Sequence, residues 1–141
     1  MKLPLGFTVK FKKAKLPLKN KLIGKYCFLE PINIRKHSKD LYKNNSLDKK
    51  NAIWTYLPYG PFKSYGSFKK WLKSFCLNKD PFFYAIYSKR HRQYCGMASY
   101  LRITPEHGSI EVGHINYSPI LQNTVEGTET MYLMMKNAFE V

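Results

Sequence analysis

Residues 108–141 constrain the fold most, because an alternating strand pattern runs through a short polar loop directly into an amphipathic helix. The strand pattern covers residues 109–117 and the helix pattern covers residues 125–139. This order places free backbone N–H groups and a helix N-terminus at the carboxyl end of a strand. Such a junction suits an anionic, phosphate-bearing ligand, although an ordinary strand–helix connection has the same pattern.

The rest of the chain predicts a single α+β domain. Further strand patterns cover residues 22–30, 82–88 and 94–103, and helix patterns cover residues 34–45 and a segment that starts at Ser64 or Ser67. Pro31 ends the first strand, and Asn33 can cap the first helix. The short turns between the last three strands indicate an antiparallel meander. A length of 141 residues fits one domain with a buried core.

The formal net charge of +15 is unevenly distributed. Of the 24 basic side chains, 23 precede residue 106, whereas residues 106–141 have a net charge of −4. Residues 1–22 form a basic extended arm, in which Phe7, Val9 and Phe11 alternate as in an edge strand. The arm could dock on RNA or another polyanion. However, 20 of the 24 basic residues are Lys, and a solvated arm is the simpler interpretation.

The three cysteines, Cys27, Cys76 and Cys95, are odd in number and have no metal-ligand spacing. We interpret them as reduced thiols of a cytoplasmic protein. The sequence predicts neither a membrane span nor a signal peptide, because it has no long apolar run. We expect no metal site, since the histidines have no Cys or carboxylate at ligand spacing.

Four segments together resemble the GNAT N-acetyltransferases, in the branch like the ribosomal-protein N-terminal acetyltransferases. The opening strand and first helix of that branch are similar to KYCFLEPINIRKHSKDLY, and its aromatic loop to WTYLPYGPF. Its central meander is similar to GMASYLRITPEHGSIEVGHINYSP, and its coenzyme-binding loop and helix to LQNTVEGTETMYLMM. The match keeps the family's order over nearly the whole chain. The resemblance therefore implies a GNAT-like mixed sheet with an antiparallel meander and flanking helices.

The chain departs from the family pattern in the coenzyme loop, which reads Gln/Arg-x-x-Gly-x-Gly/Ala in the family. Gln122 and Gly127 match, but Val125 replaces the first glycine and could crowd a diphosphate. Glu126 adds a negative charge that would repel it. The second departure is the end of the chain, since the family continues through a further strand, a helix and a hairpin.

These missing elements predict that residues 23–141 are the N-terminal portion of a truncated GNAT domain, with residues 1–22 as the arm. A truncated domain is expected to bind the coenzyme weakly and to turn over slowly or not at all. Its exposed strand edge could be covered by a dimer or by a second-half fragment. A decayed or split gene product is the remaining alternative.

The resemblance implies transfer of an acetyl group from acetyl-coenzyme A to an amine, which would be a protein N-terminus or a small amine. Backbone groups at Ile115, Asn116 and Tyr117 would pair with the pantetheine and polarise the thioester carbonyl. The amides that would hold the diphosphate belong to Gln122, Asn123, Thr124, Val125, Glu126, Gly127 and Thr128.

Glu111 is the candidate general base, which would draw a proton off the ammonium directly or through water. Strand alternation places Glu111 on one face with Gly113, Ile115 and Tyr117, and it places His114 and Asn116 on the other. The alternative is a solvated strand glutamate. Gly113 permits a bulge that would splay the strand from its neighbour. Three aromatic residues, Trp54, Tyr56 and Tyr59, could wall an acceptor pocket or simply pack under their loop.

Overall fold

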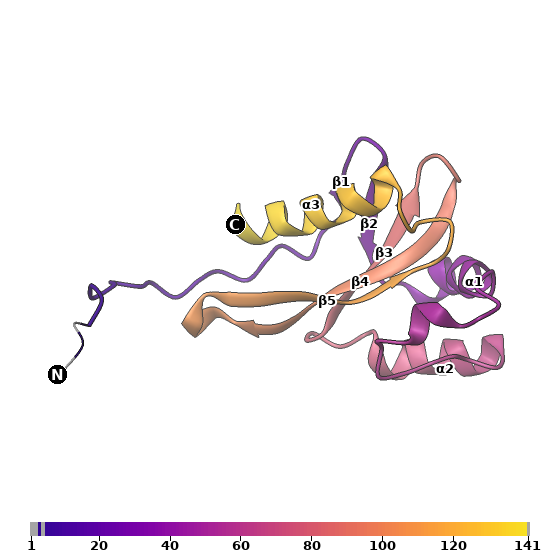
Figure 1. Ribbon diagram of the computed structural model, residues 1–141, viewed down its shortest axis with the longest axis horizontal. Coiled ribbons are helices and arrows are strands. Elements are labelled where there is room, and N and C mark those ends of the chain that lie inside the picture. Colours follow the sequence, from indigo (N-terminus) through magenta and orange to yellow (C-terminus); the bar gives the residue numbers. More distant parts are fainter. Residues whose placement is uncertain (1–2, 4, 141) are drawn as a thin grey trace.

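A computed structural model describes residue 3 and residues 5–140 of the chain. The elements are β1 (Leu22–Ile23), β2 (Cys27–Pro31), α1 (Ile34–Asn45), η1 (Ala52–Trp54), α2 (Tyr65–Phe75), β3 (Phe82–Ser88), β4 (Gln93–Thr104), η2 (Pro105–His107), β5 (Ser109–Tyr117) and α3 (Val125–Phe139). Over this part of the chain the strands form one five-stranded sheet in the order β1-β2-β3-β4-β5 (Figure 1). Each strand pairing is antiparallel, so the expected α+β class and meander are confirmed, but the sheet described here is not mixed.

The sheet is covered on both faces, which explains the continuous apolar run of β3. Tyr84 and Ile86 are fully buried in the cluster beneath α3. Phe83 and Ala85 alternate with them and are fully buried in the cluster beneath α1 and α2. α3 therefore lies on one face of the sheet, and α1 and α2 lie on the other (Figure 1).

The helix starts agree with the capping residues in the sequence. The Asn33 side chain accepts the Lys36 N–H at 3.0 Å at the start of α1. Ser64, rather than Ser67, is the N-cap of α2, and the two serines form a reciprocal capping box. Helix α3 and strand β5 span the predicted residues.

The single strand expected over residues 22–30 is wrong, because the chain turns between β1 and β2. The Glu129 carboxylate of α3 accepts the backbone N–H groups of Lys25, Tyr26 and Cys27 at 2.7, 2.7 and 2.8 Å. Burial would raise the pKa of Glu129, but these three amides outweigh it and lower the pKa. A Cβ at Gly24 would overlap the same carboxylate. The turn is thus shaped by a residue of the last helix.

The described part of the arm contains no strand before Leu22, so the expected edge strand at residues 7–11 is wrong. The arm is attached to the β4–β5 tip, where the Ala14 N–H donates to the Pro105 carbonyl oxygen at 3.0 Å. The Phe11 ring packs over Gly108 there. Residues 5–10 are exposed and extend beyond the hairpin (Figure 1). The division into an arm and a domain stays a proposal.

Glu30 of β2 predicts a specific acid sensitivity of the fold. Burial would raise the pKa of Glu30, but hydrogen bonds from Lys21, Lys36 and Tyr94 lower it from 4.5 to about 2. A carboxylate with a lowered pKa stabilises the fold above its ordinary pKa and loses this contribution as the pH falls from 4.5 towards 2. Because both lysines are about half exposed, we expect Glu30→Gln to lose only about 1–2 kcal/mol at pH 7.

Urea unfolding between pH 7 and pH 3 measures this contribution. The gap between the wild type and Glu30→Gln should narrow as the pH falls. Glu106→Gln is the matched control, because the Glu106 carboxylate pairs with Lys13 on the exposed surface and should leave the curve unchanged. Part of the gap should remain at pH 3, because the folded-state pKa is about 2; a gap that does not narrow between pH 4.5 and pH 3 would contradict the assignment.

Candidate functional site

The first turn of α3 is held against the end of β5 by hydrogen bonds. Thr124 is the N-cap in extended backbone, and its Oγ1 accepts the Gly127 N–H at 3.1 Å. The Tyr117 hydroxyl donates to the Gly127 carbonyl oxygen at 2.9 Å. Burial raises the pKa of Tyr117, so this hydroxyl stays a neutral donor. A Cβ at Gly127 would lie 3.0 Å from the Leu121 carbonyl oxygen, which explains the glycine.

Four backbone amides at this junction have no acceptor within residues 5–140: those of Asn123, Thr124, Val125 and Glu126. The other three predicted amides are engaged: Gln122 donates to the Ser118 carbonyl, Gly127 to Thr124 Oγ1, and Thr128 to the Thr124 carbonyl. Asn123 has a φ of 56°, and a left-handed residue before a helix turns successive N–H groups into an anion-binding nest. The candidates for backbone amides that could bind an anion are therefore those of residues 123–126 rather than all of residues 122–128.

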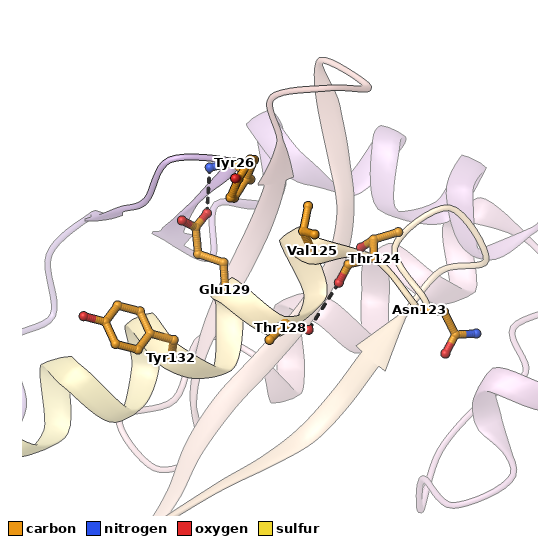
Figure 2. A pocket seen from close by; sticks show the side chains of 7 residues that line it. All are labelled: Tyr26, Asn123, Thr124, Val125, Thr128, Glu129 and Tyr132. Carbon is orange, nitrogen blue, oxygen red and sulfur yellow. Dashed lines mark hydrogen bonds between the residues drawn. The ribbon is translucent and has the colours of Figure 1, made fainter.

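Of the four residues that carry these amides, Asn123 and Val125 are exposed, Thr124 is half-buried and Glu126 is buried. The Gln122 side chain donates to the Tyr117 carbonyl oxygen at 3.0 Å. Glu126 is only 3% exposed, and its Oε1 accepts the Ser88 hydroxyl at 3.2 Å, so its carboxylate is buried and not at the surface of the loop. Val125 is 58% exposed and projects outward from the helix start (Figure 2).

Two pockets flank the start of α3. The first has a volume of 640 Å³ and is lined by Tyr26, Asn123, Thr124, Val125, Thr128, Glu129 and Tyr132 (Figure 2). The second has a volume of 460 Å³ and lies on the β5 side, where Tyr117 and Met131 contribute to its wall. Both pockets are lined by Asn123, Thr124, Thr128 and Tyr132. A ligand on the free amides can therefore extend to either side of the helix.

Strand β5 contains the bulge that Gly113 permitted. Gly113 pairs with Ser99 and Asn116 pairs with Met97, so two residues, His114 and Ile115, lie opposite Ala98 alone. His114 has a φ of 48°, a left-handed conformation that costs a non-glycine residue about 1–3 kcal/mol. The extra residue breaks the alternation that the sequence implied.

The bulge changes which predicted residues share a face. His114 packs on Phe83 and Phe75, so it lies on the α2 face with Glu111, and the expected opposite placement is wrong. Tyr117 lies on the α3 face instead of sharing the face of Glu111. Asn116 is fully buried, and its side-chain atoms have no hydrogen-bond partner within residues 5–140. The whole residue, backbone included, is therefore closed to solvent.

Glu111 lies over Gly113 on the α2 face. Its Oε1 would be 3.1 Å from a Cβ at Gly113, and its Oε2 is 3.0 Å from Nη1 of Arg102. Both side chains of this ion pair are substantially exposed, so the carboxylate is open to solvent. Of the aromatic residues, Trp54 is buried in the core, Tyr56 is 97% exposed, and Tyr59 contacts His114.

The sequence predicted neither the contact between Tyr59 and His114 nor the hydrogen bonds of Glu129 to the turn between β1 and β2. Tyr59 and His114 are 55 residues apart, and no spacing along the chain signals their contact. Gly113 beside a polar strand residue was the available signal for the bulge.

No group of three or more His, Cys, Asp and Glu side chains in residues 5–140 is arranged to hold a metal ion. The helices of this described part are too short or too polar to cross a membrane.

Solved structures with the same fold include several acetyltransferases. A GCN5-related N-acetyltransferase from Brucella melitensis superposes with a TM-score of 0.89 at 29% identity over 94% of this chain and 60% of that chain. A candidate GNAT-family acetyltransferase from Chromobacterium violaceum gives a TM-score of 0.83 at 29% identity over 99% of this chain and 70% of that chain. A candidate ribosomal-protein-serine acetyltransferase from Vibrio cholerae gives a TM-score of 0.69 at 12% identity, covering 89% and 70% of the two chains.

The chain thus spans about 60–70% of the length of these three structures. No protein-family model and no curated protein matches the sequence.

Proposed function

Because the chain has the GNAT N-acetyltransferase fold, we propose that it belongs to an enzyme that moves an acetyl group from acetyl-coenzyme A to an amine. The observation that carries the proposal is the row of free amides at residues 123–126, where β5 leads into α3. Four N–H groups at the positive end of a 15-residue helix match the charge of a diphosphate.

The residues fit the coenzyme better than the loop sequence alone indicated. In this proposal the amides of 123–126 hold the diphosphate, and the outward Val125 side chain and the buried Glu126 carboxylate leave the amides open. Gln122, Gly127 and Thr128 support the loop rather than touch the ligand.

The free edge of β5 is the proposed site for the pantetheine. Within residues 5–140, β5 pairs with β4 alone, and the bulge at His114 and Ile115 re-aims the backbone groups that follow it. Backbone groups of Ile115 and Tyr117 would pair with the pantetheine amides and polarise the thioester carbonyl, whereas the expected contribution of Asn116 would need this buried residue to become exposed. When bound, the coenzyme supplies the activated acetyl group.

The amine would approach from the α2 face, where Glu111 lies. A carboxylate in this place can draw the proton off the ammonium, directly or through a neighbouring group. The acceptor would be a protein N-terminus or a small amine. The three buried, unpaired cysteines support the expectation of a reducing compartment such as the cytoplasm.

Calorimetric titration with coenzyme A tests the proposal, followed by an acetyl-transfer assay with a peptide N-terminus and a small polyamine as acceptors. We expect saturable one-site binding and transfer to one acceptor class. The absence of saturable binding up to about 1 mM coenzyme would contradict it.

The basic arm carries the alternative function, docking on RNA or another polyanion. Its Lys10, Lys12 and Lys15 are in extended chain outside the folded sheet. RNA binding that falls steeply between about 50 and 200 mM salt, and that disappears on deletion of residues 1–21, would support this alternative. Coenzyme binding should survive the same deletion.

A further inference from the structure

His114 is held in a strained conformation by aromatic side chains from three other parts of the fold. Its ring stacks on Tyr59 at 5.6 Å between centroids and contacts Phe75 of α2 and Phe83 of β3 at 5.4 Å each. A φ of 48° inside a strand persists only when its surroundings enforce it. The bulge and the aromatic residues together aim the imidazole onto the α2 face, which it would not reach in a regular strand.

One nitrogen of His114 is engaged and the other is free. The Tyr59 Oη atom lies 3.0 Å from Nδ1, whereas Nε2 has no partner within residues 5–140. Either atom can donate in this bond; in the tautomer that suits a base, Nδ1–H donates to the Tyr59 oxygen and the Nε2 lone pair is available. His114 is only partly buried, so the residue keeps some contact with solvent.

The charged and titratable groups around His114 favour proton uptake from a substrate. Glu111 of β5 faces the imidazole, and Arg102 of β4 pairs with that carboxylate at 3.0 Å. Tyr59 faces it from the loop after η1, and burial keeps this hydroxyl neutral by raising its pKa. Burial lowers the pKa of His114, and Glu111 partly offsets the effect, so the imidazole is neutral near pH 7.

We propose that His114 is a catalytic base of the acetyl transfer, that Tyr59 is its positioning residue, and that Glu111 stabilises the imidazolium. This inference rests on the proposed function. The ammonium of the acceptor gives one proton to Nε2, and the free amine attacks the thioester carbonyl carbon. The C–N bond forms, the C–S bond breaks, and the second nitrogen proton leaves with the coenzyme sulfur as a thiol. Solvent then takes the proton from His114.

The tautomer of His114 tests the assignment without any turnover. In a long-range ¹⁵N–¹H spectrum of the labelled chain, we expect the Nδ1–H form with an unprotonated Nε2. His37 is the internal reference, because its Nδ1 accepts the Asn33 N–H at 3.0 Å and it must have the opposite tautomer. Tyr59→Phe keeps the ring but removes the oxygen, and it should mix the tautomers of His114 while leaving His37 unchanged. An Nε2–H form of wild-type His114 would overturn the proposal.

Kinetics provide the second readout. His114→Gln should lower kcat/KM for acetyl transfer about 100-fold, and Tyr59→Phe about tenfold with a shifted acid limb of the pH profile. His107→Gln, in η2, should leave both unchanged. If the wild type transfers acetyl groups and His114→Gln matches it, the His114 proposal fails and the proposed function stands. If the wild type neither binds coenzyme nor transfers acetyl groups, the proposed function fails. The tautomer of His114 then decides by itself whether Nε2 is free to accept a proton.

Discussion

Gly96→Ala should destabilise the protein by about 2 kcal/mol, because this glycine lies where β4 meets both β5 and the loop to α3. A Cβ there would lie 2.6 Å from Leu121 Cδ2 and 2.9 Å from the Asn116 carbonyl oxygen. The Leu121 side chain is fully buried, and the Asn116 oxygen belongs to the backbone of a paired strand. Neither neighbour can move without disturbing the junction that supplies the free amides.

The same substitution at Gly66 is the matched control. Gly66 is in the first turn of α2, and its nearest neighbour for a Cβ is Ser64 Oγ at 3.8 Å. Gly66→Ala should therefore be neutral or stabilising by about 0.5–1 kcal/mol, since alanine is the better helix former. Urea unfolding of both variants measures the difference. Equal stabilities would mean that the end of β5 does not pack against Gly96 as described.

Val125→Pro should weaken coenzyme binding about tenfold without unfolding the protein. Val125 is the first residue of α3, where proline is favoured and where its missing N–H disturbs no hydrogen bond of the helix. The preceding Thr124 has a φ of −117° and a ψ of 160°, which suits a residue before proline. The substitution thus removes one of the four free amides, and a charge-assisted hydrogen bond of this kind contributes about 1.5 kcal/mol.

Val125→Ala is the control, because it removes the side chain and keeps the amide. With Val125 58% exposed, this variant should bind coenzyme as well as the wild type or slightly better. Calorimetry at one salt concentration, with thermal unfolding as a check on the fold, measures both variants. If alanine weakens binding as much as proline does, the valine side chain rather than the backbone makes the contact.

Most of the fold could be predicted from local patterns. The apolar periodicity, the cap at Asn33 and the alternatives Ser64 and Ser67 located the first two helices, because a cap depends only on residues within one turn. The strand β3 was equally clear, since a run buried on both faces has no polar positions. The order of these elements also led to the fold, which the solved acetyltransferases confirm.

The features that could not be predicted depend on contacts between distant residues. The turn between β1 and β2 follows from Glu129, which lies more than 100 residues further along the chain. The position of the bulge decides which face each residue of β5 occupies, and alternation counted along the sequence cannot reveal one inserted residue. Glu111 precedes the bulge, and its residue type alone made it a candidate base. His114 lies in the bulge, and for this reason the alternation placed it on the wrong face of the sheet.

The most direct measurement is a titration of the ¹⁵N-labelled chain with coenzyme A, followed through the backbone amide resonances. We expect saturable shifts centred on Asn123, Thr124, Val125 and Glu126, with smaller effects along the edge of β5. The amide of Gly127, already bonded to Thr124, should move less than its neighbours. Shifts confined to the lysines of the arm, or none at residues 123–126, would contradict the claim that these amides hold an acetyl-group carrier.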